Sequence, residues 1–599
     1  MLDNVRKSLS LLTANEKRKG LLVLALMIIV ALVEVVGVAS VLPFIGVLSR
    51  PELVHSNEWL NWAYTGLGFE TERRFLFFLA LMFFSVVVIS IGMKILFTYA
   101  MVRLSELIGY SVARRLVAGY LRQPYEWFLG QHSANIGKTV LSEIEAVING
   151  AIKPIMEIVS KSLISLLIIT LLIVVDPLLA GAAGFGLMVA YALAYAVLRG
   201  PLKRLGQRRL EANRRRFRVI NESFGGIKEL KVGGLEGAAL RQFKQPAREF
   251  AAMRARSAIF SGVPPLIIEA FLMAGVVLFA LFMLAGEGDL EATLPILALF
   301  AFAILRMKPA LQSVYTNFSK LRFSGPALDN LHQSLQELEP ESGSHLGMKR
   351  EAPLPVRTGI ELSDIRYRYP GAGTDTIHGI EMLIPAGSRA GLVGSTGAGK
   401  TTMVDIMLGL LKPYQGTMRV DGVPIDSENM RAWRSTIGYV PQHIYLTDGS
   451  IRENIAFGVP EEQIDDRQVR QAAVLAQMAD FVETELPRAY DTEIGERGVR
   501  LSGGQRQRIG IARALYHNPS VLILDEATSA LDNQTESAVM LAVEALAGAK
   551  TVILIAHRLS TVERCDQIYM LENGRLVGQG DFNSLMESNE KFRRIAQVG

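Results

Sequence analysis

The sequence predicts a polytopic α-helical membrane domain followed by a soluble α/β domain of the P-loop type. Long apolar runs fill the first half of the 599 residues and stop near residue 308. Beyond that point the composition is that of an ordinary soluble domain, and the pattern Gly-x-x-x-x-Gly-Lys-Thr occurs at 394–401. A mean hydropathy of +0.27 with only 20% charged residues excludes a disordered chain.

The composition divides the chain into a membrane domain at 1–325, a linker at 326–357 that is rich in Pro, Gly, Ser and charge, and a soluble domain at 358–599. Each apolar run is close to the roughly 20 residues that a hydrocarbon layer about 30 Å thick requires, and in lipid such a segment must be helical. A buried core helix is the alternative for any single run, but six runs joined by charged loops exclude it. The expected spans are 21–46, 75–99, 152–175, 178–198, 259–285 and 290–308.

The placement of lysine and arginine orients the helices, because cytoplasmic loops carry an excess of these residues. The chain before the first span and the connection at 199–258 are strongly basic. The short loop after the fifth span is acidic, with Glu287 and Asp289. Both termini, the long helical connections at 100–151 and 199–258, and the soluble domain are therefore expected in the cytoplasm.

The cysteine content, the net charge and the first apolar run exclude several classes of protein. A single cysteine, Cys565, excludes a disulfide framework or a cysteine-ligated cluster and is typical of a buried small hydrophobe. The net charge of +5 is modest for this length. The arginine run at 214–218 is explained by the expected cytoplasmic side of this connection and by attraction to anionic lipid head groups. No nucleic-acid partner is therefore expected. The first apolar run is too long for a cleaved signal peptide and is followed by Pro43 and bulky residues.

The segment GLVGSTGAGKTT at 391–402 follows an apolar strand and precedes a helix, which is the context of a phosphate loop. Its glycines let backbone N–H groups converge on the β- and γ-phosphates of a nucleotide, Lys400 adds a positive charge, and the Thr401 hydroxyl can ligate Mg²⁺. The residues expected to bind the nucleotide here are Gly394, Ser395, Thr396, Gly397, Ala398, Gly399, Lys400, Thr401 and Thr402.

Two carboxylates stand at the end of the apolar strand VLILD. Asp525 can hold Mg²⁺ and Glu526 can polarise the attacking water, because the turn at a strand end lets both reach the phosphates. The alternative for an Asp-Glu pair after a strand is a helix N-cap, which is less plausible downstream of a phosphate loop. LSGGQRQR at 501–508 places a serine and two glycines at a helix start, which is a second phosphate-binding surface in the same domain.

The motifs of residues 358–599 together resemble the nucleotide-binding domain of ATP-binding-cassette transporters. They are, in order, Tyr369, the phosphate loop, Gln442 in YVPQ, LSGGQ, LILDEATSALD and His557 in IAHRLS. The resemblance implies that Tyr369 stacks on the adenine of ATP and that Gln442 touches Mg²⁺ and the attacking water. It implies that Glu526 is the catalytic base and that His557 contacts the γ-phosphate and positions Glu526. It also implies that the γ-phosphate held by an opposite subunit is bound by Ser502, Gly503, Gly504 and Gln505.

One chain carries one membrane domain and one nucleotide domain, whereas the composite ATP sites of this family need two of each. The resemblance therefore implies a half-transporter, and a symmetric homodimer with a second copy of the chain is the simplest closure. Six spans before the cassette resemble the exporter architecture, in which ATP joins the nucleotide domains and hydrolysis separates them. The segment at 492–505 resembles the part that links this movement to cytoplasmic loop ends, expected near 124–140 and 221–236.

Two segments, the opening span at 33–52 and residues 225–236 of the connection between the fourth and fifth spans, resemble flippases of lipid-linked oligosaccharides in bacterial protein glycosylation. The resemblance implies a protein of the bacterial cytoplasmic (inner) membrane that moves a polyprenyl-pyrophosphate glycan between leaflets. Lys94, Arg306 and Lys308 lie in or beside the spans and would suit the pyrophosphate, while snorkelling to the interface is the alternative.

Three questions stay open from the sequence. Glu34 in the first span can pair with one of these basic residues, but its partner is not defined. Trp59, Trp62 and Tyr64 fit either a short amphipathic helix at the lipid interface or an ordinary aromatic belt. The cassette motifs carry no substrate information, so an exporter of lipids, drugs or peptides is one alternative, and a regulatory membrane ATPase without transport is another.

Overall fold

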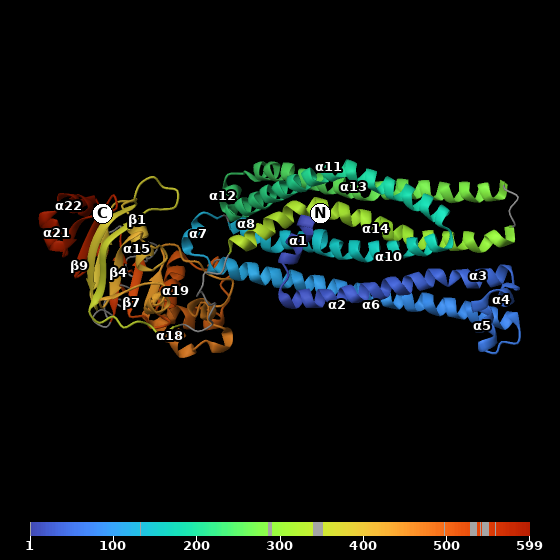
Figure 1. Cartoon of the computed structure of the whole chain (residues 1–599). Coiled ribbons are helices and arrows are strands. Elements are labelled where there is room, and N and C mark those ends of the chain that lie inside the picture. The colour runs from blue at the N-terminus through green and yellow to red at the C-terminus, as the bar shows by residue number, and fades with distance from the viewer. Residues whose placement is uncertain are drawn as a thin grey trace. The chain divides into compact units, whose positions relative to one another are not determined.

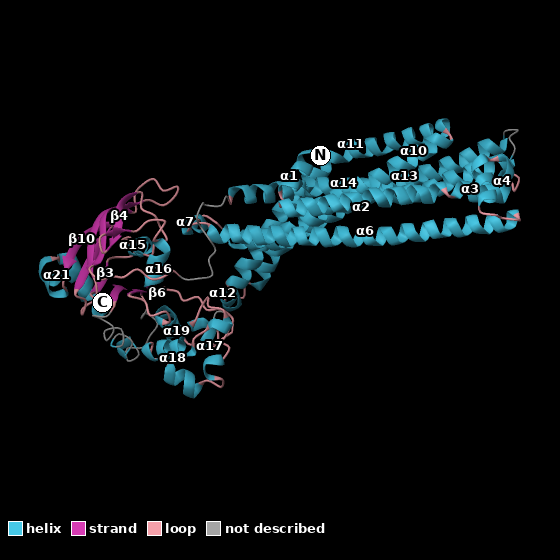
Figure 2. Ribbon diagram, turned by 60° about the horizontal axis from the view of Figure 1, so that its bottom comes forward, coloured by secondary structure: helices cyan, strands magenta, loops and turns pink. Residues whose placement is uncertain are grey.

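A computed structural model describes residues 2–131, 133–285, 290–338, 351–495, 498–526, 536–538, 541, 550–556 and 559–598. The chain forms two compact units. The first comprises Met1–Gln123 and Gln131–Ser344, and the second comprises Pro124–Gly130 and His345–Gly599. Within the described residues the first unit is helical, and the strands belong to the second (Figure 2). The predicted fold class, a helical membrane domain with an α/β nucleotide-binding domain, is confirmed.

The first unit is built from long helices, some of them interrupted by short segments. Its α-helices are α1 (Leu2–Ser10), α2 (Ala14–Ala39), α3 (Val41–Ser49), α4 (Leu53–Ser56), α5 (Glu58–Gly66), α6 (Glu72–Arg122), α8 (Ser133–Lys138), α9 (Ile144–Val147), α10 (Lys153–Val175), α11 (Pro177–Gly225), α12 (Ile227–Val232), α13 (Glu236–Ala285) and α14 (Leu290–Glu337). Two π-helical segments, η1 (Thr139–Glu143) and η2 (Ile148–Ile152), lie between α8 and α10. Helix α2 packs along α6, α11 along α13, and α10 along α14 (Figure 1).

Three helical segments are long and apolar enough to cross a membrane: Ala14–Ser49, Glu72–Arg122 and Ile136–Val175. This statement concerns the described residues alone. They contain the first three expected spans, and the other three fall in α11, α13 and α14. The number of six spans therefore stays a prediction. The first span is divided between α2 and α3, since Pro43 has no backbone N–H to donate to the preceding turn.

Helix α14 extends further than the sequence indicated. Residues 326–337 were expected to open the linker, but they continue the helix to Glu337. Ala327, Leu328 and Leu331 are buried, so an apolar face anchors this end of the helix to the first unit. The prediction of a linker is wrong for 326–337.

Apolar side chains from α2, α10 and α14 form the core of the first unit. Ala31, Ile168, Leu299 and Ala303 are all fully buried there. Small residues let the helix backbones approach closely, as is usual between membrane helices. The crossing of α11 over α14 depends on such a residue, because a Cβ on Gly206 would lie 2.1 Å from the carbonyl oxygen of Phe323.

The Gly206→Ala substitution is expected to force α11 away from α14 and to lower the free energy of unfolding by about 2 kcal/mol. Gly200→Ala on the same helix is the matched control, since its Cβ would meet no atom within 4 Å and alanine favours a helix over glycine. Thermal unfolding of the purified chain measures both. Equal midpoints for the two variants would contradict the close crossing at Gly206.

Two sheets form the framework of the second unit. An antiparallel sheet has the order β2-β1-β4-β5, and a six-stranded sheet has the order β10-β9-β3-β8-β7-β6 and is parallel except for β10. The strands are β1 (Gly359–Tyr367), β2 (Ile377–Pro385), β3 (Arg389–Val393), β4 (Gln415–Val420), β5 (Val423–Pro424), β6 (Ile437–Val440), β7 (Val521–Asp525), β8 (Thr551–Ile555), β9 (Gln567–Glu572) and β10 (Arg575–Gly580).

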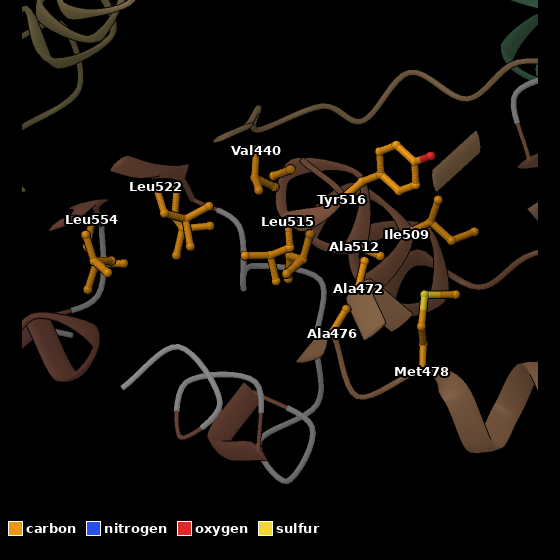
Figure 3. Close-up of a cluster of buried hydrophobic side chains, with 14 of the residues drawn as sticks. Val440, Ala472, Ala476, Met478, Ile509, Ala512, Leu515, Tyr516, Leu522 and Leu554 are labelled. Atoms are coloured by element: carbon orange, nitrogen blue, oxygen red, sulfur yellow. The ribbon is translucent and has the colours of Figure 1, made fainter. Parts of the chain in front are cut away.

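Helices cover the parallel sheet and bury its apolar strands. The α-helices of this unit are α7 (Tyr125–Leu129), α15 (Lys400–Met407), α16 (Met430–Thr436), α17 (Ile451–Ile455), α18 (Asp466–Leu475), α19 (Gly503–Leu515), α21 (Phe582–Ser588) and α22 (Glu590–Val598). On one side, Val440, Leu522 and Leu554 of neighbouring strands belong to the same buried cluster as Ala512 and Leu515 of α19 (Figure 3). In such a sheet, ligands bind beyond the carboxyl ends of the strands, which here are the ends of β3, β6, β7 and β8.

Candidate nucleotide site and a charged cluster among the helices

The phosphate loop joins the end of β3 to the start of α15 and has the backbone shape that its glycines permit. Gly394 has φ 153°, and a Cβ there would lie 2.3 Å from the carbonyl oxygen of Leu571. Gly399 caps α15 with φ 100°, in the left-handed region that side chains rarely adopt. A larger residue at either position would therefore displace the loop. The loop ends at a helix N-terminus, which favours a bound anion.

The Lys400 ammonium lies inside the loop. It donates to the carbonyl oxygen of Gly394 at 2.7 Å and to that of Ser395 at 3.1 Å, and the residue is only 6% exposed. Burial lowers the pKa of Lys400, while the nearby charges of Glu526 and Asp525 act in the opposite direction. The structure thus places a cation at the phosphate loop and within electrostatic range of both carboxylates. Thr401 is exposed at the same end of α15.

The carboxylate pair stands at the end of β7. Asp525 is 5% exposed, whereas Glu526 turns out of the strand with φ 50°, and its N–H donates to the carbonyl oxygen of Ile555 at 3.1 Å. The Gln507 amide donates to the carbonyl oxygen of Glu526 at 3.2 Å. The backbone therefore turns at Glu526 instead of continuing the strand, and the reach of both carboxylates to the phosphates stays a prediction.

Gln442 and Glu526 are brought together although they are 84 residues apart in sequence. The Gln442 Nε2 donates to Glu526 Oε2 at 2.8 Å. Gln442 follows β6 and Glu526 follows β7, and these two strands are parallel neighbours. Two of the three expected catalytic side chains are therefore in direct contact. His557 lies outside the described residues, so its predicted role stays a prediction.

Tyr369 lies beside the phosphate loop. Its hydroxyl is 3.1 Å from Thr402 Oγ1, and its ring packs edge-on against that of Tyr367, with centroids 5.0 Å apart. The Tyr369 side chain is thus held near the nucleotide site by α15. Stacking on adenine stays a prediction.

The LSGGQ segment caps α19. The Ser502 N–H donates to Gln505 Oε1 at 2.8 Å, and the Gln505 N–H donates to Ser502 Oγ at 3.2 Å, which is a reciprocal capping box. Within the described part of the chain, no hydrogen bond joins residues 502–505 to residues 394–402. Among the described residues, the two phosphate-binding surfaces of one chain are therefore not hydrogen bonded to each other.

Two residues near the carboxylates were not predicted from the sequence. Burial, followed by the charges of Asp525 and Asp405, raises the pKa of Tyr439. Asp405 lies on α15, five residues after Lys400, and the charge of Asp525 also raises the pKa of its carboxyl. An acidic residue in an otherwise apolar stretch, VDIM, was a signal for Asp405, while nothing distinguishes Tyr439 from an ordinary strand aromatic.

Asp405→Asn is expected to stabilise the protein at pH 8 and to change its stability little at pH 4. Burial, and then the charge of Asp525, raise the pKa of Asp405 from 3.8 to about 6. Such a carboxyl stabilises the fold below its unfolded pKa and loses that contribution as the pH rises through about 6. The gain of the asparagine variant at pH 8 should be about 1–2 kcal/mol. Thermal unfolding at both pH values tests this, and a gain that does not increase with pH would contradict it.

Residues Pro124–Gly130 belong to the second unit, although helices of the first unit flank them in sequence. Glu126 Oε1 accepts from the backbone N–H of Lys412 at 3.4 Å. Burial, followed by the charges of Asp405 and Tyr369, raises the pKa of Tyr125. Part of the segment expected near 124–140 thus packs in the unit that holds the nucleotide site. The segment at 221–236 lies in the first unit.

The buried carboxylate of Glu34 is hydrogen bonded to two of the three basic residues that were predicted to bind the substrate. Glu34 is 4% exposed and accepts from Lys94 at 2.5 Å, from the Ser90 hydroxyl at 2.9 Å and from Arg306 at 3.5 Å. The sequence left the partner of Glu34 open, and the structure supplies two cations. Lys308 is separate, because its ammonium pairs with Glu269.

Comparison with known proteins agrees with this architecture. Residues 20–307 match the ABC transporter transmembrane region and residues 377–529 match the ABC transporter family. The chain therefore belongs to the ABC transporters, as a half-transporter of the exporter type. It is a multi-pass membrane protein, and its ABC domain implies ATP binding.

The ATP-dependent lipid A-core flippase of Saccharophagus degradans is 36% identical over 63% of this chain and 62% of the relative. The protein of the same description from Bordetella pertussis is 33% identical over 66% of this chain and 62% of the relative. The chain thus spans a little over three fifths of the length of these curated relatives. The solved structure of a bacterial Atm1-family ABC exporter with ATP bound covers 97% of this chain and 98% of that chain, with a TM-score of 0.75 and 23% identity, which shows a shared fold.

Proposed function

We propose that the chain hydrolyses ATP and couples this reaction to export across a membrane. The observation that carries the proposal is the contact of Gln442 with Glu526 at the strand end that also bears Asp525, within electrostatic range of Lys400. Phosphoryl transfer to water needs positioned charge and an oriented water more than covalent chemistry. These residues supply both.

Glu526 is the group that orients the attacking water and accepts its proton. Gln442 holds one oxygen of Glu526 in place by a hydrogen bond, which orients the carboxylate toward the water. Lys400 offsets the charge of the phosphates. The donor set suits Mg²⁺, because the Asp525 carboxylate, the Thr401 hydroxyl and the Gln442 amide are hard oxygen ligands. When bound with ATP, the metal ion would neutralise phosphate charge.

The working assembly is a homodimer in the cytoplasmic (inner) membrane of a bacterium, with both termini on the cytoplasmic side. The lack of a hydrogen bond, among the described residues, between Ser502–Gln505 and the phosphate loop of the same chain supports this, because a second copy can bring its LSGGQ segment to the first copy's loop. A symmetric pair then forms two equivalent sites. The basic connection at 199–258 supports the orientation.

The proposed substrate is a lipid-linked oligosaccharide with a polyprenyl-pyrophosphate anchor. Lys94 and Arg306 support an anionic head group, since both ammonium and guanidinium groups bind phosphate oxygens and both lie in the membrane unit. Flippase relatives support a lipid substrate in general. Export of another lipid, a hydrophobic drug or a peptide is the second candidate, which the shared cassette favours equally.

Reconstitution of the purified chain in vesicles tests the proposal. ATP-dependent movement of a fluorescent lipid-linked oligosaccharide is expected, and it should be lost in Glu526→Gln and reduced in Lys94→Ala and Arg306→Ala. Hydrolysis without movement of this lipid would remove it as substrate, and phospholipids and drugs would then be compared as stimulators of hydrolysis. Hydrolysis without transport of any candidate would favour a regulatory ATPase.

A further inference from the structure

The loop that carries Tyr369 is exposed over most of its length. It spans residues 368–376 between β1 and β2, and residues 370–374 are all exposed. Two of these five residues are glycines, and a Cβ on either of them would meet no atom within 4 Å. Glycine gives the backbone wide conformational freedom, which Gly371 uses with φ 81°. The position of Tyr369 therefore depends on contacts at the two ends of the loop.

The carboxylate of Asp375 joins these two ends to a third segment. Its Oδ1 accepts from Nε of Arg368 at 2.8 Å, and its Oδ2 accepts from the hydroxyl of Tyr414 at 2.5 Å. The guanidinium carbon of Arg368 lies 5.9 Å from the centroid of the Tyr414 ring. The Asp375 side chain is only 12% exposed, and hydrogen bonds to a charged group are stronger than those between neutral groups. Arg368, Asp375 and Tyr414 form a closed set of contacts, which we term the loop clamp.

The loop clamp fastens the loop to the antiparallel sheet. Tyr414 directly precedes β4, which pairs with β1, and its N–H donates to the carbonyl oxygen of Arg366 at 3.1 Å. At the base of the loop, the N–H of Thr376 donates to the carbonyl oxygen of Tyr367 at 2.8 Å. That bond alone would let the loop tilt about its base, and the attachment to Tyr414 opposes such a tilt. The backbone beside Tyr369 is thus held in place before any nucleotide arrives.

From this arrangement we infer that Asp375 is a positioning residue for ATP, which through Arg368 and Tyr414 holds the loop so that the Tyr369 ring can stack on the adenine. A ring that is already ordered loses less conformational entropy when the base binds. Asp375 therefore acts on the base end of the nucleotide, whereas Lys400 acts on the phosphate end. The inference rests on the proposed function and deepens it, because it names the side chain that sets how tightly the base is held.

A double-mutant cycle on ATP affinity tests the inference. Equilibrium binding of tritiated ATP to the full chain is measured with Mg²⁺ omitted to prevent hydrolysis. Asp375→Ala is expected to weaken binding about 3-fold to 10-fold, as for the partial loss of an aromatic stacking contact. Tyr369→Ala should weaken binding at least as much. Asp375→Ala should cause no further loss when it is added to Tyr369→Ala, because Asp375 acts through that ring.

The kinetics of hydrolysis give a second readout that a general loss of stability would not reproduce. With Mg²⁺ present, Asp375→Ala should raise KM for ATP by a factor similar to the loss of affinity. Its kcat should stay unchanged, because the loop clamp does not contact Glu526 or Gln442 among the described residues. A fall in kcat at unchanged KM would contradict a role in holding the base.

Asp566→Ala is the matched control. Asp566 also pairs with an arginine, since its Oδ1 lies 3.1 Å from Nη2 of Arg389. This pair stands at the start of β3, whereas the phosphate loop follows the end of that strand, so ATP affinity should equal that of the wild type. If Asp375→Ala does not fold, Tyr414→Phe takes its place in the cycle, because it removes one hydrogen bond of the loop clamp and keeps the ring beside Arg368.

The outcomes separate this inference from the proposed function. If the wild type binds ATP and the clamp variant binds it equally well, the role of Asp375 is wrong while the proposed function stands. Additive losses in the double variant would also overturn the inference, since Asp375 would then act independently of Tyr369. If the wild type does not bind ATP, the proposed function and the inference both fail.

Discussion

Glu526→Gln is expected to bind ATP normally and to lose nearly all ATP turnover, by at least about 100-fold. Glutamine has the shape of glutamate and can still meet Gln442, whose amide lies 2.8 Å from the Glu526 carboxylate. It cannot accept a proton from the attacking water. In the proposed homodimer hydrolysis separates the nucleotide domains, so this variant is expected to accumulate as an ATP-bound dimer. Phosphate release and nucleotide retention on the purified chain measure the two effects.

Glu572→Gln is the matched control for this prediction. Glu572 ends β9, another strand of the same sheet, and its carboxylate pairs with Lys591 at the surface. An exposed ion pair of this kind contributes little to stability, so turnover should stay close to that of the wild type. Normal hydrolysis by Glu526→Gln would show that Glu526 is not the base.

Lys400→Ala is expected to weaken ATP binding itself, by about 10-fold to 100-fold, because a buried cation that faces the phosphates is removed. Equilibrium binding of a fluorescent ATP analogue measures the change. Lys412→Ala removes an exposed lysine of the same unit and serves as the control. Unchanged affinity in Lys400→Ala would contradict the assignment of the phosphate loop. Lys400→Ala tests ATP binding and Glu526→Gln tests hydrolysis, so these two variants together separate the two steps.

Short sequence motifs predicted those parts of the nucleotide site that are formed by residues close together in the sequence. The phosphate loop and the turn at Glu526 are of this kind, since glycine spacing and a strand end define them within a few residues. The meeting of Gln442 with Glu526 depends on the order of strands in the sheet, which one sequence does not encode in any short motif. The resemblance to a family placed both residues at the attacking water, but it did not predict their contact. Tyr439 was missed for the same reason, because its position next to Asp525 follows from the pairing of β6 with β7.

In the membrane unit, too, some features were predicted from the sequence and others depend on contacts between distant segments. Hydropathy alone located the apolar runs, but which faces of the helices meet is decided by packing between distant segments. The pairing of Glu34 with both Lys94 and Arg306 joins three helices and could not be derived from the sequence. The end of α14 was missed because polar residues surround Leu328 and Leu331, and a short apolar face is hard to distinguish from a linker until its partner helix is known.

The position of the Lys400 side chain bears on how quickly the transporter can turn over. Its ammonium is already hydrogen bonded to two carbonyl oxygens of its own loop, so an incoming phosphate exchanges partners instead of adding new ones. The net gain in free energy on phosphate binding is then the difference between two sets of hydrogen bonds. The loop therefore needs little rearrangement when the phosphate binds or leaves. Such an exchange of partners limits the affinity that Lys400 adds, which favours product release in the proposed transport cycle.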